Sequence, residues 1–195
     1  MLTLFHAPKS RSTRVLALLH AMGKLSDVDI KTIEIARQDG SAGDQLNNPH
    51  PENKVPLLVH DDELIRETPA IMVYLTDHFQ SQLGRQVGET GRGTYLSWMA
   101  YYGDVVEPVV VGNFIGCADD PMFVSTFRGL NEIYVSITNA LDDARFLMGD
   151  DITAVDLLMA SPFQWAPNTM PEVPAIQDWV KRVSEHPSSA WAAER

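Results

Sequence analysis

The fold of this 195-residue chain is decided by residues 54–75, which read KVPLLVHDDELIRETPAIMVYL. Two short runs of mainly apolar residues, 55–59 and 63–65, flank turn-forming residues at 60–62 and predict two strands joined by a tight turn. From residue 68 the apolar side chains recur at helical spacing, with Thr68 suited to a cap and Pro69 to the first helical position. The stretch therefore predicts a β-hairpin that leads directly into a helix.

The residues before this stretch predict a strand, a helix and a second strand. Residues 2–5 are β-prone, residues 12–22 carry apolar side chains at helical spacing, and residues 27–35 alternate. Residues 37–53 are rich in Gly, Asn, Asp and Pro and predict a loop with one short helix near 43–47. Because a β-α-β unit places its crossover helix on one face of the sheet, we expect a small sheet covered by helices.

The character of the chain changes after residue 80. Residues 81–93 are polar and glycine-rich, which suits a linker. The patterns beyond the linker are helical, and they cover 95–114, 121–146, 153–165 and 174–185. The sequence therefore predicts an α+β protein, with a βαβ-ββα domain over 1–80 followed by an all-α helical-bundle domain over 94–195.

The composition limits the classes of function. The chain is 45% hydrophobic with a net charge of −11, which suits a folded core and argues against binding to nucleic acid or to an anionic membrane. The single cysteine, Cys117, has no disulfide partner, and the six histidines follow no metal-ligand spacing, so no metal is expected. Because the sequence shows neither a signal-peptide pattern nor a long apolar run, we expect a cytoplasmic protein.

Two segments suit a small charged ligand. Free amides at the start of the helix near Thr68 suit an anion, and the Glu67 carboxylate beside them suits an ammonium group, so together they fit an α-amino acid. Lys54 offers a positive charge, and a cis Pro56 would leave the backbone of Val55 open to an extended peptide. Taken alone, an ordinary capped helix is the preferred interpretation of the first segment, and a trans edge proline is an alternative for the second.

The turn between the first strand and the first helix carries two hydroxyls. A hydroxyl that is hydrogen-bonded to a thiolate favours the ionised form and lowers the pKa of the thiol. Ser10 or Ser12 could supply this hydroxyl, while the other serine caps the helix. Arg11 and Arg14 would add positive potential, although each is interpreted first as a solvated surface charge.

A later helix start is marked near residue 153. Thr153 can cap the free amides while Asp156, three residues on, caps back, and Ile152 and Leu157 flank this box as a hydrophobic staple would. Asp156 is therefore interpreted as a buried capping residue rather than a catalytic carboxylate. Its loss is expected to cost about 0.5–2 kcal/mol.

Together these segments resemble the glutathione transferases. The matching segments follow the order and spacing of that family over nearly the whole chain; they are residues 10–23, Lys54-Val55-Pro56, 67–71 with Tyr74-Leu75, and 149–156. The chain is similar to a bacterial cytosolic member with a serine-type active site. The resemblance implies a thioredoxin-like N-terminal domain and a homodimer.

The resemblance also implies roles for individual residues. A cis Pro56 would let Val55 pair with the cysteinyl backbone of glutathione, Glu67 and Thr68 would hold the γ-glutamyl end, and Lys54 would lie near a carboxylate. Ser10 would stabilise the thiolate and is preferred over Ser12, which fits a helix cap better. The chain has Phe5 and His6 where tyrosine-type members carry their tyrosine, and it has no cysteine near Ser10. A thiol-disulfide reductase is therefore disfavoured, and Cys117 is interpreted as inert.

The implied activity is conjugation of glutathione, as co-substrate and without a metal, to small and largely apolar electrophiles in detoxification. The electrophile is expected against the first helix of the helical domain, near Gly103 and Glu107, with Tyr102 and Trp165 as aromatic walls. Packing between helices is at least as good an interpretation of these two aromatics. The alternatives are a non-catalytic binding or regulatory protein, or a glutathione-dependent dehalogenase, isomerase or peroxidase on the same scaffold.

Overall fold

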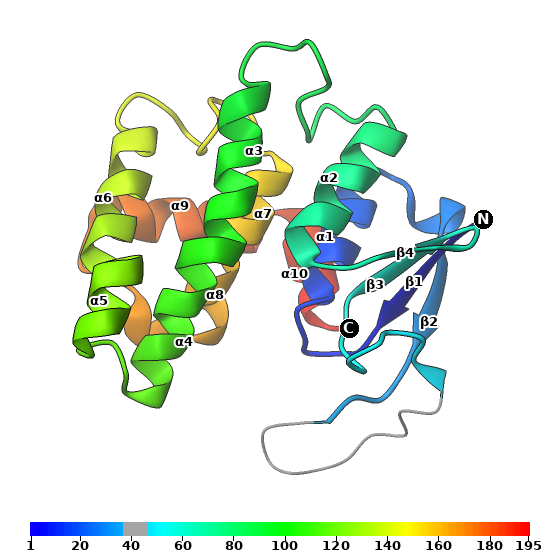
Figure 1. Ribbon diagram of the computed structural model, residues 1–195. Helices are drawn as coiled ribbons and strands as arrows, with labels where there is room; N and C mark the ends of the chain where they lie inside the picture. The colour runs from blue at the N-terminus through cyan, green and yellow to red at the C-terminus, as the bar shows by residue number, and fades with distance from the viewer. Residues whose placement is uncertain (37–46) are drawn as a thin grey trace. The chain divides into compact units, whose positions relative to one another are not determined.

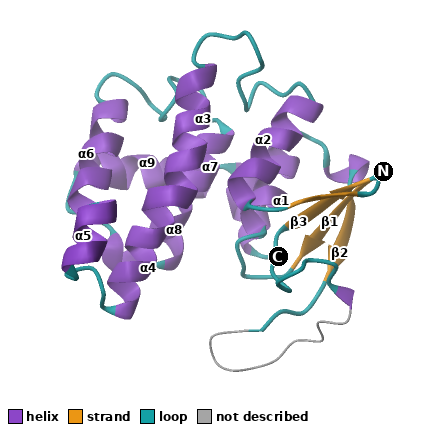
Figure 2. Ribbon diagram, viewed as in Figure 1, coloured by secondary structure: helices purple, strands orange, loops and turns teal. Residues whose placement is uncertain are grey.

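A four-stranded mixed sheet forms from the strands predicted near the N-terminus (Figures 1 and 2). The computed structural model describes residues 1–36 and 47–195, so the short helix expected near 43–47 falls outside the described residues except for its last position. In the spatial order β2-β1-β3-β4, the strands are β2 (Asp29–Thr32), β1 (Leu2–His6), β3 (Leu57–His60) and β4 (Glu63–Ile65). β2 runs parallel to β1, whereas β3 runs antiparallel to both β1 and β4. The predicted thioredoxin-like arrangement is confirmed.

In the part of the chain that the structure describes, the sheet is accompanied by the helices α1 (Thr13–Ala21), α2 (Thr68–His78) and α10 (Pro187–Ala193) and by the 3₁₀ turn η1 (Leu25–Asp27). α10 packs against α1. The ring of His20 on α1 stacks on Trp191 with 4.6 Å between centroids, and its Nδ1 lies 2.8 Å from the hydroxyl of Ser188. The last helix of the chain therefore belongs with the first.

The helical half begins with α3 (Arg92–Tyr101) and continues without a strand through the described residues that follow it. Its further elements are the π-helical turn η3 (Tyr102–Val106), α4 (Glu107–Ile115), α5 (Pro121–Phe127), α6 (Leu130–Leu141), α7 (Ala154–Met159), α8 (Ser161–Trp165), the 3₁₀ turn η4 (Pro167–Thr169) and α9 (Pro174–Glu185). The largest fully buried side chain is Trp179, on α9. Among the residues that the structure describes, none of the helices combines the length and apolar character that crossing a membrane requires.

Two of the predicted helices are interrupted. The pattern over 95–114 becomes α3 and α4 with the π-helical turn between them, which inserts an extra residue into the helix. The pattern over 121–146 breaks at Arg128, whose φ of 64° is incompatible with a continuing helix, and the second piece ends at Leu141. The valines at 109–111 lie in α4, as predicted.

Asp156 is a buried capping residue, as predicted. Its Oδ2 accepts hydrogen bonds from the backbone and hydroxyl of Thr153, at 2.8 and 2.9 Å. Its Oδ1 accepts from the backbone of Leu147 at 2.9 Å and from the indole of Trp179 at 3.0 Å. Burial raises the pKa of the Asp156 carboxyl, and these four donors oppose that effect. The carboxyl thus ties the start of α7 to the loop before it and to α9.

The chain divides into two compact units. The first comprises residues 1–75 and 187–195, and the second comprises residues 76–186. Residues 187–195, which the sequence pattern assigns to the helical domain, belong to the first unit because α10 packs on α1. As folding domains, 1–80 and 94–195 joined by a linker remain a prediction.

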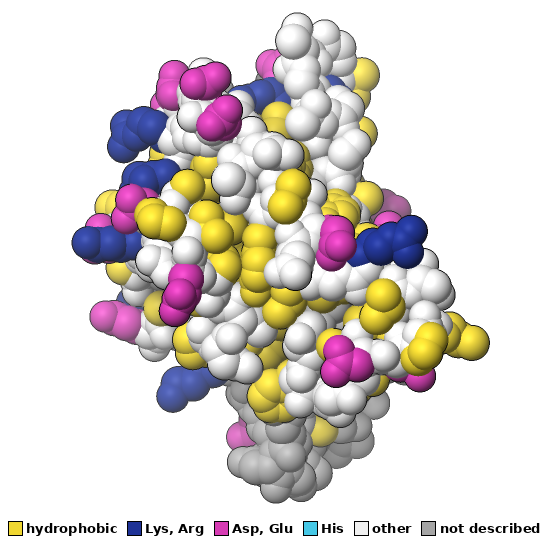
Figure 3. Space-filling model, turned by 90° about the vertical axis from the view of Figure 1, so that its left-hand side faces the viewer, with side chains coloured by type: hydrophobic (Ala, Val, Ile, Leu, Met, Phe, Trp, Pro, Cys, Tyr) yellow, Lys and Arg dark blue, Asp and Glu magenta, His cyan; other side chains and the backbone are white. Residues whose placement is uncertain are grey.

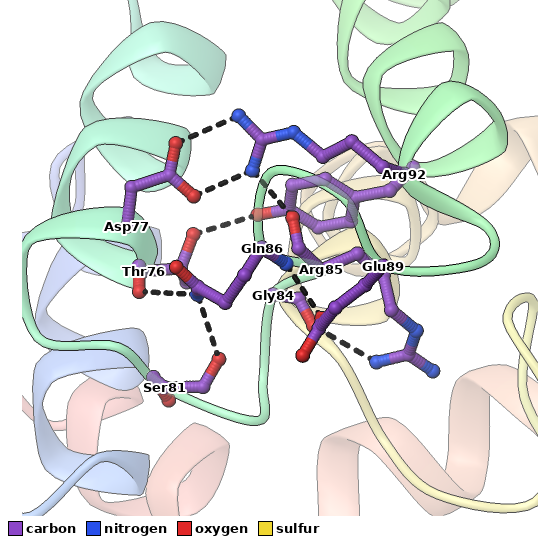
Figure 4. Close-up of polar contacts among 9 residues, drawn as sticks. Thr76, Asp77, Ser81, Gly84, Arg85, Gln86, Glu89 and Arg92 are labelled. Carbon is purple, nitrogen blue, oxygen red and sulfur yellow. Dashed lines mark hydrogen bonds and ion pairs between the residues drawn. The ribbon is translucent and has the colours of Figure 1, made fainter.

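Polar contacts hold the segment between α2 and α3 (Figure 4). Arg92 donates to both oxygens of Asp77 at 2.5 and 2.7 Å, and the hydroxyls of Thr76 and Tyr95 lie 3.0 Å apart. The amide of Gln86 donates to the carbonyl of Thr76 at 3.0 Å. The end of α2, the linker and the start of α3 are therefore joined through side chains as well as through the backbone.

Candidate functional site

Three loops leave the sheet at the same end because of the strand register. β1 ends beside the start of β3, where Phe5 lies opposite Leu57. β4 also ends there, because it runs antiparallel to β3 with Ile65 opposite Leu58. The loops that carry the predicted glutathione and thiolate residues therefore share one end of the sheet; they cover residues 7–12, 54–56 and 66–68.

An apolar cluster joins two of these loops, and its buried members are Phe5, Ala7, Ile33, Val55 and Leu57. Ala7 opens the loop that carries the two serines, and Val55 stands directly before Pro56. Because both side chains pack in one cluster, the loop over residues 7–12 (the serine turn) and the loop over residues 54–56 (the proline turn) are fixed relative to each other.

The peptide bond between Val55 and Pro56 is cis, as the family resemblance implies. Lys54 is exposed, and its ammonium lies 2.7 Å from Glu52, which itself lies 3.9 Å from Arg66. The hydrogen bond from Lys54 lowers the pKa of the Glu52 carboxyl. A ligand carboxylate that binds Lys54 must therefore compete with Glu52.

The start of α2 differs by one residue from the prediction. The carbonyl of Glu67 accepts the first hydrogen bond of the helix, from Ile71 at 2.9 Å, so Glu67 rather than Thr68 occupies the cap position. Thr68 is buried as the first helical residue, and Pro69 is the second. The free amides and the Glu67 carboxylate still lie together at the positive end of the helix dipole.

Backbone strain gathers around these loops. Three non-glycine residues with positive φ each stand directly before a predicted site residue, and they are Lys9 (φ 53°), Asn53 (φ 52°) and Glu67 (φ 66°). Asparagine tolerates this conformation, whereas lysine and glutamate adopt it rarely. Strain of this kind often accompanies a functional site.

The two serines form a hydrogen-bonded cluster with the histidine that ends β1. The hydroxyl of Ser12 lies 2.7 Å from Nδ1 of His6 and 2.6 Å from the hydroxyl of Ser10, and it accepts from the backbone of Ala7 at 3.1 Å. The Ser10 hydroxyl donates to the carbonyl of Ala7 at 2.7 Å and accepts from the backbone of Ser12 at 3.2 Å. Ser12 is fully buried, whereas Ser10 is only partly buried.

The expected capping role of Ser12 is wrong. Ser12 occupies the cap position of α1, but its hydroxyl makes no capping hydrogen bond and points instead to His6 and Ser10. His6 had no role in the sequence interpretation beyond standing where other members carry a tyrosine. Its location at the last position of a strand, six residues before Ser12, was the available signal.

Burial lowers the pKa of His6 to about 4. The side chain is 3% exposed, so the ring is neutral at physiological pH and carries a proton on one nitrogen only. Arg14 is also buried, at 7% exposure, and is not the solvated surface charge that was expected; Arg11 is exposed.

The residues expected to line the electrophile site all lie in the second unit. Tyr102 and Gly103 begin the π-helical turn, and Glu107 is the first residue of α4. Tyr102 is buried, Gly103 is exposed and Glu107 is partly buried. Trp165, at the end of α8, is 41% exposed. Sequence spacing did not anticipate the π-helical turn on which the first two residues stand.

Both halves of the chain match models of one family. The model of the glutathione S-transferase N-terminal domain matches residues 1–77, and that of the glutathione S-transferase C-terminal domain matches residues 107–187. Together the two matches account for most of the chain. Glutathione S-transferase mdpJ of Emericella nidulans is 25% identical over an alignment of 162 residues, which covers 80% of this chain and 70% of that protein.

Solved structures share the fold over the full chain. A glutathione S-transferase of Actinobacillus pleuropneumoniae has a TM-score of 0.79 at 23% identity, covering 100% of this chain and 92% of its own. A sphingomonad glutathione S-transferase, solved in complex with glutathione, has a TM-score of 0.77 at 21% identity, with coverages of 98% and 97%. With the fold shared and both domain models matched, this chain belongs to the glutathione S-transferase family.

Proposed function

We propose that this protein is a serine-type glutathione transferase, which conjugates the thiolate of glutathione to small, largely apolar electrophiles. The observation that carries the proposal is the partly buried Ser10 hydroxyl, which shares one end of the sheet with the Val55–Pro56 turn and the start of α2. A hydroxyl that donates to sulfur at this point stabilises the thiolate and lowers the pKa of the thiol. Ser10 is preferred over Ser12 because Ser12 is fully buried.

The other predicted residues would hold glutathione along its length. The backbone of Val55 would pair with the cysteinyl residue, and the start of α2 with the Glu67 carboxylate would take the carboxylate and ammonium of the γ-glutamyl end. Lys54 would approach a carboxylate after release from Glu52. The glutathione in the sphingomonad structure supports this choice of ligand.

The reaction is a nucleophilic attack by sulfur on carbon. The thiol proton leaves to solvent, and the new sulfur–carbon bond forms while the bond to a leaving group breaks and the leaving group keeps its electron pair. In conjugate addition the electron pair moves into the acceptor, which then takes a proton from water. Most of the acceleration would come from holding the two reactants together, with Tyr102, Gly103, Glu107 and Trp165 proposed to receive the electrophile.

The test compares conjugation of chlorodinitrobenzene by the wild type and by Ser10→Ala. We expect the substitution to raise the pKa of the bound thiol by about one to two units, and so to lower kcat/KM about 10- to 100-fold near neutral pH. Ser26→Ala is the matched control, because Ser26 is an exposed serine in η1, and it should leave kcat/KM unchanged. Product analysis by mass spectrometry would reveal dehalogenation, isomerisation or peroxide reduction.

The same preparation distinguishes a transferase from a binding protein. Retention on immobilised glutathione without turnover of any electrophile, and with no effect of Ser10→Ala, would establish the non-catalytic alternative. Weaker retention of Glu67→Gln and Lys54→Gln than of the wild type would support the proposed orientation of the ligand.

We also propose a cytoplasmic homodimer with a role in detoxification. Exposed apolar side chains lie on α4, α5 and α6, and they are Phe114, Ile115, Met122, Val124 and Val135. Apolar side chains also reach the surface on the face of the molecule that Figure 3 shows. Apolar surface of this kind often marks an interface between proteins. Light scattering at micromolar concentration should give the mass of a dimer, and a monomeric mass would refute this part of the proposal.

A further inference from the structure

We infer that His6 is a positioning residue, which acts through the hydroxyl of Ser12 to direct the single proton of Ser10 outward, toward the sulfur of bound glutathione. The inference rests on the proposed function, and it adds a residue that neither the family resemblance nor the sequence pattern assigns. It follows from the directions in which the hydrogen bonds of the serine turn can run.

Ser12 has two acceptor lone pairs and one proton. The backbone N–H of Ala7 occupies one lone pair at 3.1 Å. If Nδ1 of His6 carries the ring proton, it donates to the second lone pair at 2.7 Å. The proton of Ser12 is then left for the hydroxyl of Ser10, at 2.6 Å.

Ser10 is saturated in the same way. Its oxygen accepts from the hydroxyl of Ser12 and from the backbone N–H of Ser12, at 2.6 and 3.2 Å. The only proton of Ser10 can therefore not point toward Ser12, and without a ligand it is donated to the carbonyl of Ala7 at 2.7 Å. A sulfur anion beside Ser10 competes with that carbonyl for the proton.

If the hydrogen bonds run in the opposite direction, from Ser10 through Ser12 to His6, fewer hydrogen-bonding groups find a partner. If Nδ1 of His6 accepts from Ser12, the proton of Ser10 must fill the 2.6 Å contact between the two hydroxyls, and its 2.7 Å bond to the Ala7 carbonyl is lost. When His6 donates to Ser12 and Ser12 donates to Ser10, the only contact that lacks a proton is the 3.2 Å contact from the Ser12 hydroxyl to the same carbonyl. The network therefore assigns the proton of His6 to Nδ1.

The chemistry of the chain supports this role. The depressed pKa of His6, about 4, keeps the ring neutral, so it acts as a hydrogen-bond donor and does not take up the thiol proton. Hydrogen bonds that run in one direction polarise one another, which strengthens the last donor in the chain. His6 thus makes Ser10 a better donor to the thiolate without touching glutathione.

One experiment reads the tautomer of the ligand-free protein. Long-range proton–nitrogen correlation spectra of nitrogen-labelled protein distinguish the two tautomers of a neutral histidine, and the signal of His6 is identified by its loss in His6→Asn. We expect the proton on Nδ1. A proton on Nε2 would overturn the inference whether or not glutathione binds.

A second experiment titrates the thiol of bound glutathione through the ultraviolet absorbance of the thiolate. His6→Leu removes the donor, and we expect it to raise the pKa of the bound thiol by about 0.5–1 unit, a three- to tenfold fall in the dissociation constant of the thiol. His6→Asn keeps an N–H near the place of Nδ1 and should restore most of the wild-type value. Ser12→Ala should act like His6→Leu, and the double variant should add little because both residues act through one chain.

The affinity for S-methylglutathione separates positioning from a loss of structure. This ligand has no thiolate, so His6→Leu should bind it as the wild type does. Equal thiol pKa values in wild type and His6→Leu would overturn the inference about His6 but not the proposed function. An equal loss of affinity of His6→Leu for glutathione and for S-methylglutathione would do the same. A wild type that binds no glutathione would overturn the proposed function and this inference with it.

Discussion

The backbone of Glu67 adopts a φ of 66° directly before the first residue of α2. Such a conformation costs a non-glycine residue about 1–3 kcal/mol and persists only where the surroundings impose it. The same residue carries the carboxylate proposed for the γ-glutamyl ammonium. Stability therefore favours glycine at position 67, whereas ligand binding favours glutamate.

We expect Glu67→Gly to separate these demands. Glycine relieves the strain, so the free energy of unfolding should match or exceed that of the wild type by up to about 1 kcal/mol, while glutathione affinity falls. Glu67→Gln keeps the strain and removes only the charge, so it should lower affinity without a gain in stability. Urea denaturation and calorimetric titration measure the two quantities, and a glycine variant less stable than the glutamine variant would contradict this account.

His6 should make stability depend on pH. Its pKa is about 4 in the folded protein against 6.5 in the unfolded chain, so between these values the unfolded chain binds more protons. The stability is fully present above pH 6.5 and is lost as the pH falls toward 4. From pH 7 to pH 5 the loss should reach about 2 kcal/mol.

The control for this pH dependence is His6→Asn, which removes the titrating ring. The difference between the wild type and this variant in urea denaturation isolates the contribution of His6 from those of other groups. Parallel pH profiles for the two proteins would show that His6 does not titrate as its burial requires.

At the scale of single residues, the sequence indicated which residues to propose for the site but not which groups they contact. Ser10, Val55 and Glu67 could be proposed as site residues from the sequence because each is local to a turn or a helix start. The partners of Ser12 were not, because whether a hydroxyl caps a helix or turns back to a strand depends on tertiary packing. The burial of Arg14 could not be predicted for the same reason, because it too depends on tertiary packing.

The elements of the helical unit depend on close approaches that a sequence does not display. Gly112 on α4 faces Phe123 on α5, and a Cβ at Gly112 would come within 2.3 Å of the ring. Because an aromatic ring in a packed position yields little, the helices must move apart to accept a larger residue.

Gly112→Ala should therefore lower the free energy of unfolding by about 1–3 kcal/mol. Gly93→Ala is the matched control, because Gly93 lies in α3 with no atom within 4 Å of a new Cβ. Alanine favours a helix, so this control should be neutral or stabilising by up to about 1 kcal/mol. Thermal denaturation compares the two variants, and equal melting temperatures would show that α5 shifts without cost.

Asp156 should matter more than an ordinary cap. Its removal leaves donors of Leu147, Thr153 and Trp179 without an acceptor in a buried place. Since each such donor costs about 1–3 kcal/mol, Asp156→Ala should cost about 3 kcal/mol or more, above the range expected from capping alone. Asp178→Ala, at an exposed position of α9, should stay within about 0.5 kcal/mol in the same denaturation experiment.

Periodicity predicted the type of most elements but not their interruptions. The valines at 109–111 were correctly assigned to a helix because their neighbours share its spacing. The π-helical turn at 102–106 and the break at Arg128 escaped prediction, because an inserted residue or a single left-handed one scarcely changes an apolar pattern.

At the scale of the whole molecule, the two ends of the chain share one compact unit. α10 covers α1, so removal of residues 187–195 should expose apolar residues of α1 that are now buried. We expect a chain that ends at His186 to melt at a lower temperature and to bind glutathione less tightly than the wild type. Truncation after Ala193 retains α10 and should have a smaller effect, and equal losses in both truncations would argue against α10 as the cause.

This membership could not be read from the sequence. Residues 174–185 and 187–193 both look helical, and only His186 separates the two helices. Nothing in the apolar spacing of the two helices shows that α9 packs on α6 and α8 whereas α10 returns to α1.

The place of α10 also bears on how the protein is made. A ribosome releases residues 76–186 before residues 187–195, so the helical unit emerges in full while the first unit still lacks its last helix. Domains usually complete their folding in the order of synthesis. Here the unit that begins first also needs residues from behind the second unit, and the nascent chain must keep the uncovered face of α1 from aggregating until residues 187–195 have been made.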